Sequence, residues 1–158
     1  MRGKRAPKRK VLPDSKYDNE KIAKFINYIM ENGKKNIAEK IIYRSFDFIV
    51  EKTKMDPLKI FEKAIKNSSP DTMVKARRIG GANYQIPMPV EEDKKFLFAS
   101  RWLIGAARER KGRPMYQKLA EEIIAASNNE GVAIKKKQDL HKMAEANKAF
   151  AYFARFVK

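Results

Sequence analysis

Apolar residues recur at spacings of three and four along most of the chain, which is the period of amphipathic α-helices. The first such stretch starts at Asp18 or Asn19, either of which can cap a helix, and ends at Asn32-Gly33. The second covers about residues 36–54. Its predicted core positions are Ile37, Ile41, Ile42, Phe46 and Ile49.

Four more helices follow from the same spacing and from capping signals. Asp56-Pro57, an N-cap followed by proline at the first helical position, opens the third helix, which stops at 68–71. The fourth follows residues 91–93, the fifth starts at Pro114, and the last begins near Lys135 and runs toward the end. Predicted core positions are Leu58, Phe61 and Ile65 on the third helix and Leu140, Met143, Ala144, Phe150, Ala151 and Ala154 on the last.

Residues 72–90 instead alternate with a period of two around Gly80-Gly81-Ala82-Asn83. This pattern predicts a β-hairpin whose turn needs positive φ angles. One face of the return strand is made of Tyr84, Ile86, Met88 and Val90. Because an isolated hairpin is marginal in water, it must be supported, and the basic residues before its tip favour a polyanion as that support.

These elements predict a mainly α fold, a single-domain bundle of about six helices with one protruding β-hairpin between the third and fourth helices. Residues 1–16 are expected to form a basic arm. Residues 17–158 are expected to form one helical domain, which is long enough to bury a core of its own.

The charge balance points to the kind of partner. Lys and Arg number 36 against 19 Asp and Glu, a net charge of +17, which predicts attraction to nucleic acid or an anionic membrane. No apolar run approaches the roughly 20 residues that cross a bilayer, and no signal peptide is evident. The absence of cysteine excludes disulfides and thiolate metal sites. We expect a cytoplasmic protein, or an organellar one if a transit peptide has been removed.

Basic residues form five separate patches, and a folded RNA, unlike a straight duplex, can meet all of them. The arm can be a solvated tail or can order on phosphate, and the basic residues elsewhere favour the second interpretation. The cations after the fourth helix also suit its C-terminal dipole. The candidate contacts are Arg2, Lys4, Arg5, Lys8, Arg9, Lys10, Lys34, Lys35, Lys75, Arg77, Arg78, Arg108, Arg110, Lys111, Arg113, Lys135, Lys136 and Lys137.

Aromatic and catalytic candidates are few. Tyr84 can stack on an unpaired base or pack within the hairpin, and Trp102 is expected in the core. His141 is the only histidine, which excludes His/Cys sites and indicates a packing or surface role. Glu121 and Glu122 are adjacent, which is poor geometry for paired carboxylates. We therefore predict no enzyme activity, no metal and no cofactor.

Three segments resemble signature blocks of a known family. They are KARRIGGANYQIPMPV (75–90), RWLIGAARER (101–110) and KKKQDLHKMAEANKAFA (135–151). They are similar to the small-subunit ribosomal protein seven family of bacterial or organellar type, as are residues 8–17 and 30–43. The resemblance therefore covers nearly the whole chain.

The resemblance implies a structural constituent of the small ribosomal subunit. It implies a primary binder of small-subunit ribosomal RNA that nucleates assembly of the head domain, at the subunit interface near the exit-site transfer RNA and the messenger path. It also implies contacts with ribosomal proteins nine and eleven, with no membrane and no small-molecule substrate. By motif, Gly80 and Gly81 join Arg77 and Arg78 as RNA contacts. The positions expected near the transfer RNA are Ala82, Asn83 and Lys142.

One departure and two alternatives accompany this interpretation. Glu91-Glu92-Asp93 stand where family members carry basic residues, so RNA contact is expected to stop there. An architectural DNA protein would also combine helices with basic β-arms, but it is expected to be a dimer with wedge residues at the arm tips. An RNA-modifying enzyme would need acid/base or cofactor motifs that the sequence does not show.

Overall fold

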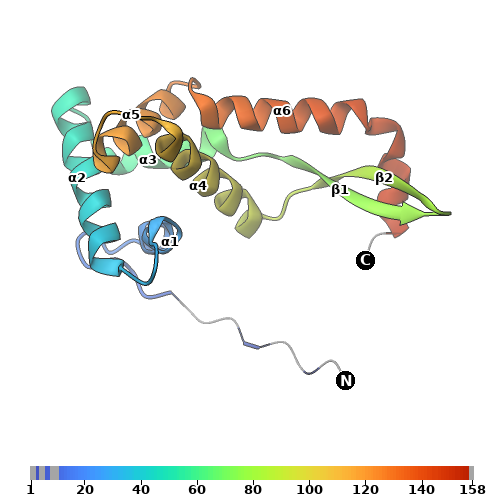
Figure 1. Cartoon of the computed structure of the whole chain (residues 1–158), viewed down its shortest axis with the longest axis horizontal. Coiled ribbons are helices and arrows are strands. Elements are labelled where there is room, and N and C mark those ends of the chain that lie inside the picture. Colours follow the sequence, from blue (N-terminus) through green and yellow to red (C-terminus); the bar gives the residue numbers. More distant parts are fainter. Residues whose placement is uncertain (1–2, 4–5, 8–10, 157–158) are drawn as a thin grey trace. The chain divides into compact units, whose positions relative to one another are not determined.

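The computed structural model describes residues 3, 6, 7 and 11–156. Along these residues the order of elements is α1 (Glu20–Ile29), α2 (Lys35–Thr53), α3 (Pro57–Ser68), β1 (Thr72–Ile79), β2 (Ala82–Pro89), α4 (Glu92–Glu109), α5 (Met115–Ser127), α6 (Val132–Ala146) and a 3₁₀ helix, η1 (Lys148–Phe156) (Figure 1). The mainly helical fold, with a hairpin between the third and fourth helices, is confirmed.

The chain divides into two compact units, residues 1–42 and 43–158, and the division lies within α2. The single domain predicted for residues 17–158 therefore stays a prediction. None of the helices in the described part of the chain is both long enough and apolar enough to cross a membrane.

Side-chain hydrogen bonds set the start of α1 in the first unit. Oδ2 of the buried Asp14 accepts from the backbone N–H groups of Lys16 and Tyr17 at 3.1 and 3.0 Å. Asn19 Oδ1 accepts from the N–H of Lys21 at 2.8 Å. Of the two predicted caps, Asn19 is thus the one that satisfies a free N–H in the first turn.

The buried face of α2 differs from the prediction at Ile37, which is exposed, and at Ile41, which is only half-buried. Ala38, Ile42, Phe46 and Ile49 are buried, whereas Ile37 is 54% exposed. The buried residues follow one another at intervals of four and three, but Ile37 lies five residues before Ile42. At 3.6 residues per turn, that interval places Ile37 on the opposite face of the helix.

The helix α3 begins as predicted, but its apolar stripe is shifted. Oδ1 of Asp56 accepts from the N–H of Leu58 at 3.0 Å, and Pro57 occupies the first turn. The buried apolar residues are Ile60, Phe61 and Ala64, while the predicted core residues Leu58 and Ile65 are only half-buried. This face packs against α5 and α4.

The strands β1 and β2 form a two-stranded antiparallel sheet with Ile79 paired to Ala82. This register leaves Gly80 and Gly81 as a two-residue turn with φ angles of +57° and +90°. Positive φ at both central residues is the type I′ geometry that matches strand twist. The prediction of positive φ is confirmed, although Ala82 and Asn83 belong to the strand and not to the turn.

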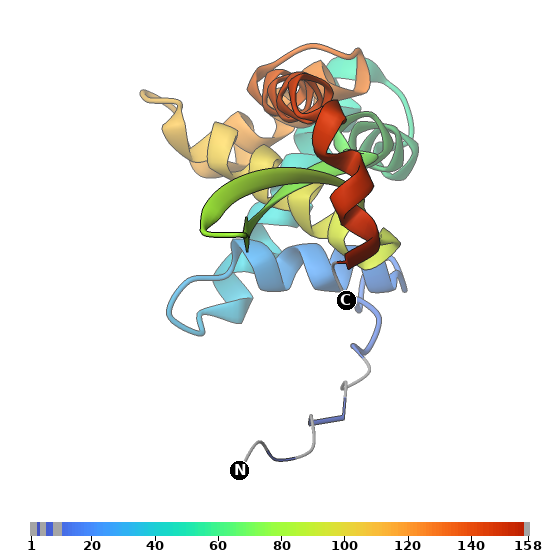
Figure 2. The same ribbon diagram turned by 90° about the vertical axis from the view of Figure 1, so that its right-hand side faces the viewer.

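Helices of the same chain support the hairpin, whereas the sequence suggested a polyanion as its support. Both strands contact α6, and β2 also contacts η1. Figure 1 shows the hairpin extending along α6, and Figure 2 shows η1 descending beside the strands. Among the described residues no third strand pairs with the hairpin, because its support is helical.

The segment predicted as one last helix forms two elements, α6 and η1, and it begins before the predicted start near Lys135. The helix α6 begins at Val132, after Gly131 with φ of +98°, and Asn147 is the residue that caps its end. The Nδ2 group of Asn147 donates to the Met143 carbonyl at 2.8 Å, a local bond that competes with the helix. Met143 is 49% exposed and Ala151 is also exposed, so the predicted burial of both is wrong, whereas Ala144 is buried.

Candidate nucleic-acid interface

The hairpin carries basic side chains on both faces. Lys75 pairs with Ile86 and Arg77 with Tyr84 across the sheet. Because successive residues of a strand point to opposite faces, Lys75 and Arg77 share the face of Tyr84, whereas Arg78 lies on the other. Lys75 and Arg78 are exposed, and Arg77 is half-buried. Each face therefore presents a cation to solvent.

Tyr84 joins the hairpin to the C-terminal 3₁₀ helix. Its ring centroid lies 5.1 Å from that of Phe150 and 5.7 Å from that of Phe153, both on η1. The structure thus shows the packing alternative for Tyr84, while stacking on a base stays a prediction. The residues at the hairpin tip, all exposed, are Gly80, Gly81, Ala82 and Asn83.

Polar contacts fix the base of the hairpin. The N–H of Asp71 donates to Nε2 of His141 at 3.2 Å, and the carbonyl of Asp71 accepts from the N–H of Val90 at 3.0 Å. The ammonium of Lys95 lies 2.8 Å from Glu92 and 3.5 Å from Asp71. These contacts, the Glu92 hydrogen bond first, raise the pKa of Lys95. His141 is half-buried and holds the base of the hairpin through Asp71, which agrees with the packing role, one of the two roles predicted for it.

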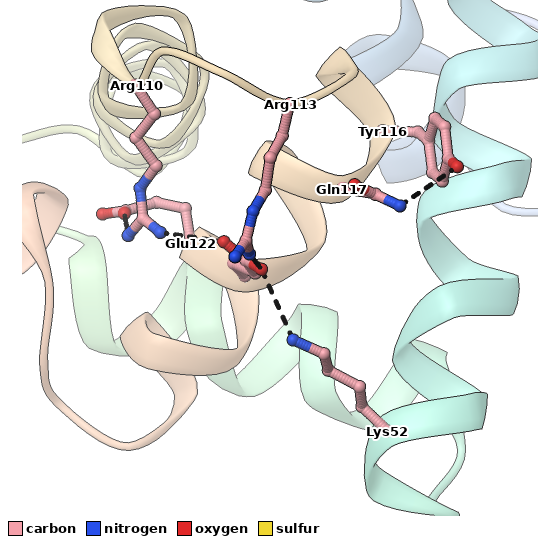
Figure 3. A network of polar contacts seen from close by, with 7 residues as sticks. Lys52, Arg110, Arg113, Tyr116, Gln117 and Glu122 are labelled. Carbon is pink, nitrogen blue, oxygen red and sulfur yellow. Dashed lines mark hydrogen bonds and ion pairs between the residues drawn. The ribbon is translucent and has the colours of Figure 1, made fainter.

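Two arginines of the corner between α4 and α5 bind acidic side chains of α5 (Figure 3). Arg110 contacts Glu121 at 3.4 Å and also contacts Glu122, while Arg113 contacts Glu121. Lys52 Nζ lies 3.4 Å from Oε1 of Glu121. Burial alone would raise the pKa of Glu121, but the Lys52 hydrogen bond and the charges of Arg113, Lys52 and Arg110 outweigh it and lower that pKa. Glu121 is therefore an ionised group that binds three cations.

The two adjacent glutamates meet through one guanidinium, although their spacing indicated poor geometry for joint action. Nη1 of Arg110 contacts Glu121 and its Nη2 contacts Glu122, which the planar fork of a guanidinium allows. The arrangement is an ion-pair network, not a pair of catalytic carboxylates. The other two predicted contacts of this corner, Arg108 and Lys111, are exposed.

The three lysines at the start of α6 are not equivalent. Nζ of Lys136 lies 3.1 Å from Oε1 of Glu109, and Nζ of Lys137 donates to the Asn67 carbonyl at 2.8 Å. Lys135 is exposed, and within the described residues it makes no ion pair. An exposed pair such as Lys136–Glu109 contributes only about 0–1 kcal/mol, so Lys136 can exchange it for a phosphate.

The remaining predicted contacts are distributed along the chain. Lys34 is exposed between α1 and α2, and Lys35, the first residue of α2, is 61% exposed and lies 3.8 Å from Glu39. Lys142 is exposed on α6. The predicted contacts that lie outside the described residues are Arg2, Lys4, Arg5, Lys8, Arg9 and Lys10.

Arg101 and Asn67 are not among the residues predicted from the sequence. Arg101 is exposed on α4, and its spacing of seven residues from Arg108, which places both on one helix face, could have revealed it. Nδ2 of Asn67 donates to the carbonyls of Ala126 and Ser127 at 3.0 Å each. No local signal could have shown that long-range contact. No cluster of three His, Cys, Asp or Glu side chains suited to a metal occurs in the described ranges.

Comparison with known proteins identifies the family. Residues 1–148 match the family model described as ribosomal protein S7p/S5e. The chain belongs to this family. Small ribosomal subunit protein uS7 of Thermotoga maritima is 55% identical over 153 residues, 97% of this chain and 99% of that protein. Proteins of the same name are 55% identical in Carboxydothermus hydrogenoformans (93% and 94% coverage) and 52% identical in Desulfatibacillum aliphaticivorans (96% and 97%).

Membership of the S7p/S5e family confirms the resemblance found in the three sequence blocks. The chain is a structural constituent of the small ribosomal subunit, an RNA-binding component of translation and not an enzyme. The match also includes both compact units, so it is not restricted to the hairpin.

Proposed function

We propose that this chain is a primary binder of small-subunit ribosomal RNA and nucleates assembly of the head domain. Family membership supports the ribosomal setting, and the exposed cations support binding to phosphate. The observation that carries the proposal is the hairpin: Lys75 and Arg78 face solvent on opposite sides of a ribbon that Tyr84 anchors to η1.

The proposal assigns different roles to the predicted basic residues. Arg110 and Arg113, whose guanidinium groups bind Glu121 and Glu122, are proposed to hold the corner, and the other basic residues are proposed to contact RNA. Base stacking by Tyr84 would use the part of its ring that Phe150 and Phe153 of η1 do not cover. The proposed RNA contacts in the described part of the chain are Lys34, Lys35, Lys75, Arg77, Arg78, Gly80, Gly81, Tyr84, Arg108, Lys111, Lys135, Lys136 and Lys137.

The proposal also gives the chain a location. It lies at the subunit interface near the messenger path, with the exit-site transfer RNA passing Ala82 and Asn83 at the hairpin tip and Lys142 on α6. Small-subunit proteins nine and eleven are its proposed protein neighbours. The exposure of the three named residues supports this assignment.

Charge reversal on the hairpin tests the proposed RNA contact. Replacing Lys75→Glu and Arg78→Glu in the full chain is expected to weaken equilibrium binding to a head-domain ribosomal RNA fragment by at least about 100-fold, the equivalent of two charge-assisted contacts. Arg77 is left unchanged because it is half-buried.

The matched control is Lys59→Glu with Lys63→Glu on the exposed face of α3, which changes the net charge equally. This control is expected to weaken binding far less. Equal losses in the two variants would show that only total charge matters. A wild-type chain that prefers duplex DNA over structured ribosomal RNA would contradict the proposed function itself.

A further inference from the structure

Glu122 is a fully buried acidic residue in a strongly basic protein. Its exposure is 0%, and the residues around it on α5, Leu119 and Ile123, are equally buried. An ionised carboxylate is unfavourable in such surroundings unless cations and hydrogen-bond donors compensate its lost hydration. The groups that contact Glu122 therefore show how the charge of this buried carboxylate is compensated.

Three separate parts of the chain meet this carboxylate. Arg110, the C-cap residue of α4, binds its Oε2. The backbone N–H of Ala133, in the first turn of α6, donates to its Oε1 at 3.1 Å. A Cβ atom on Gly131 would lie 2.9 Å from Oε1, and its φ of +98° also favours glycine. The carboxylate thus ties the end of α4 to the beginning of α6.

The contact with Ala133 explains why α6 begins where it does. The first N–H groups of a helix have no partner within the helix, and a negative charge is favourable there. Glu122 supplies both an acceptor and the charge from another helix. Gly131, the residue at the N-cap position of α6, has no side-chain oxygen, so this distant carboxylate takes the place of a local cap.

Candidate RNA contacts flank both segments that Glu122 joins. Lys111 follows Arg110 directly and is exposed. Lys135, also exposed, lies two residues after Ala133, and Lys136 further links α6 to Glu109 at the end of α4. A shift of the corner against α6 would move these lysines relative to one another. Because the phosphates of a folded RNA have fixed positions, lysines that have shifted could no longer contact them together.

We infer that Glu122 is a positioning residue for RNA binding. It holds the corner at 110–113 and the start of α6 in one arrangement, so that Lys111 and Lys135 meet the same RNA. This inference rests on the proposed RNA-binding function and adds an acidic residue to it. It follows that removal of a negative charge from this basic protein weakens its binding to a polyanion.

Glu122→Gln tests the inference in the full chain. The amide keeps the size of the side chain and an acceptor for Ala133, but it loses the ion pair with Arg110. The matched control is Glu130→Gln, an exposed position in the loop before α6 that raises the net charge by the same amount. Equilibrium binding to a head-domain ribosomal RNA fragment is measured at several salt concentrations. Urea unfolding of each variant shows that it is folded under the conditions of the binding measurement.

Glu130→Gln is expected to bind as tightly as the wild type or slightly more tightly. Glu122→Gln is expected to bind roughly tenfold more weakly, with a salt slope lower by about one for each phosphate that the variant no longer neutralises. Gly131→Ala, which crowds the carboxylate without changing any charge, is expected to weaken binding in the same direction.

Folded Glu122→Gln and Gly131→Ala that bind as tightly as Glu130→Gln would overturn the inference and leave Glu122 a residue of stability only. That result would leave the proposed function intact. A wild-type chain that fails to bind head-domain RNA in a salt-dependent manner would overturn the proposed function and this inference with it.

Discussion

The hairpin and the corner between α4 and α5 are both rich in Arg and Lys, yet they use these residues differently. On the hairpin, Lys75 and Arg78 face solvent, and residues 72–89 include no acidic residue. At the corner, two of the four cations are bound by glutamates of α5. The basic residues of a sequence therefore give its charge but not the number of cations that can bind phosphate. That number also depends on the acidic side chains that the fold places beside them.

Burial decides how firmly a cation is held. The Arg110–Glu122 contact involves a carboxylate with no exposed surface, so removal of its partner leaves an unpaired buried charge. The Lys136–Glu109 pair is exposed at both ends, at 37% and 63%, and is weak. The same kind of ion pair is therefore structural in one place and exchangeable in the other.

The largest effect is expected when the buried pair of the corner is broken. Arg110→Ala should lower the free energy of unfolding by about 3 kcal/mol, because Glu122 loses its cation. Urea unfolding followed by circular dichroism measures it. The neighbouring Lys111→Ala should change stability by less than about 0.5 kcal/mol, because its side chain is exposed. Similar small changes in both variants would show that the Arg110–Glu122 pair does not stabilise the corner.

The hairpin should respond to loss of its aromatic anchor. Phe150→Ala removes a ring packed on Tyr84 and should cost about 1–2 kcal/mol, with faster amide hydrogen exchange in β2. The control is Tyr152→Ala on the same 3₁₀ helix, where the side chain is 63% exposed. If β2 exchanged at the wild-type rate in Phe150→Ala, η1 would not be the support of the hairpin.

A smaller, pH-dependent effect is expected at Glu121. Its folded pKa lies below the unfolded value of about 4.3, so the ionised group stabilises the fold above that pH, and the contribution is lost as pH falls through the folded pKa. Glu121→Gln should therefore be about 1 kcal/mol less stable than the wild type at neutral pH. The gap should close in acid. A gap that stayed constant down to about pH 3 would show that charge is not the cause.

The fold was predictable from the sequence where the signals are local. Asp56-Pro57 marks the start of α3, and Gly80-Gly81 marks a turn with positive φ, because capping and turn geometry depend on adjacent residues. The shifted face of α2 at Ile37 was also accessible from spacing. Five residues separate Ile37 from Ile42, and this interval places the two side chains on different faces of a helix.

The long-range contacts could not be predicted in the same way. His141 accepts from Asp71 across 70 residues, and Glu122 fixes the start of α6 from another helix. Tyr84 could be named as an aromatic candidate, but its contact with η1 depends on where the chain bends after Asn147. Likewise, no local pattern separates Arg113, which binds Glu121, from Arg78, which makes no ion pair among the described residues, although both are exposed.

The most direct test of the account compares Arg78→Gln with Arg113→Gln, which each remove one positive charge. The measurement is the dependence of head-domain RNA affinity on salt concentration. Arg78→Gln is expected to lower the salt slope by about one, while Arg113→Gln lowers it far less, because Arg113 is already paired with Glu121. Equal reductions in the two variants would contradict the distinction between an RNA-facing hairpin and a structural corner.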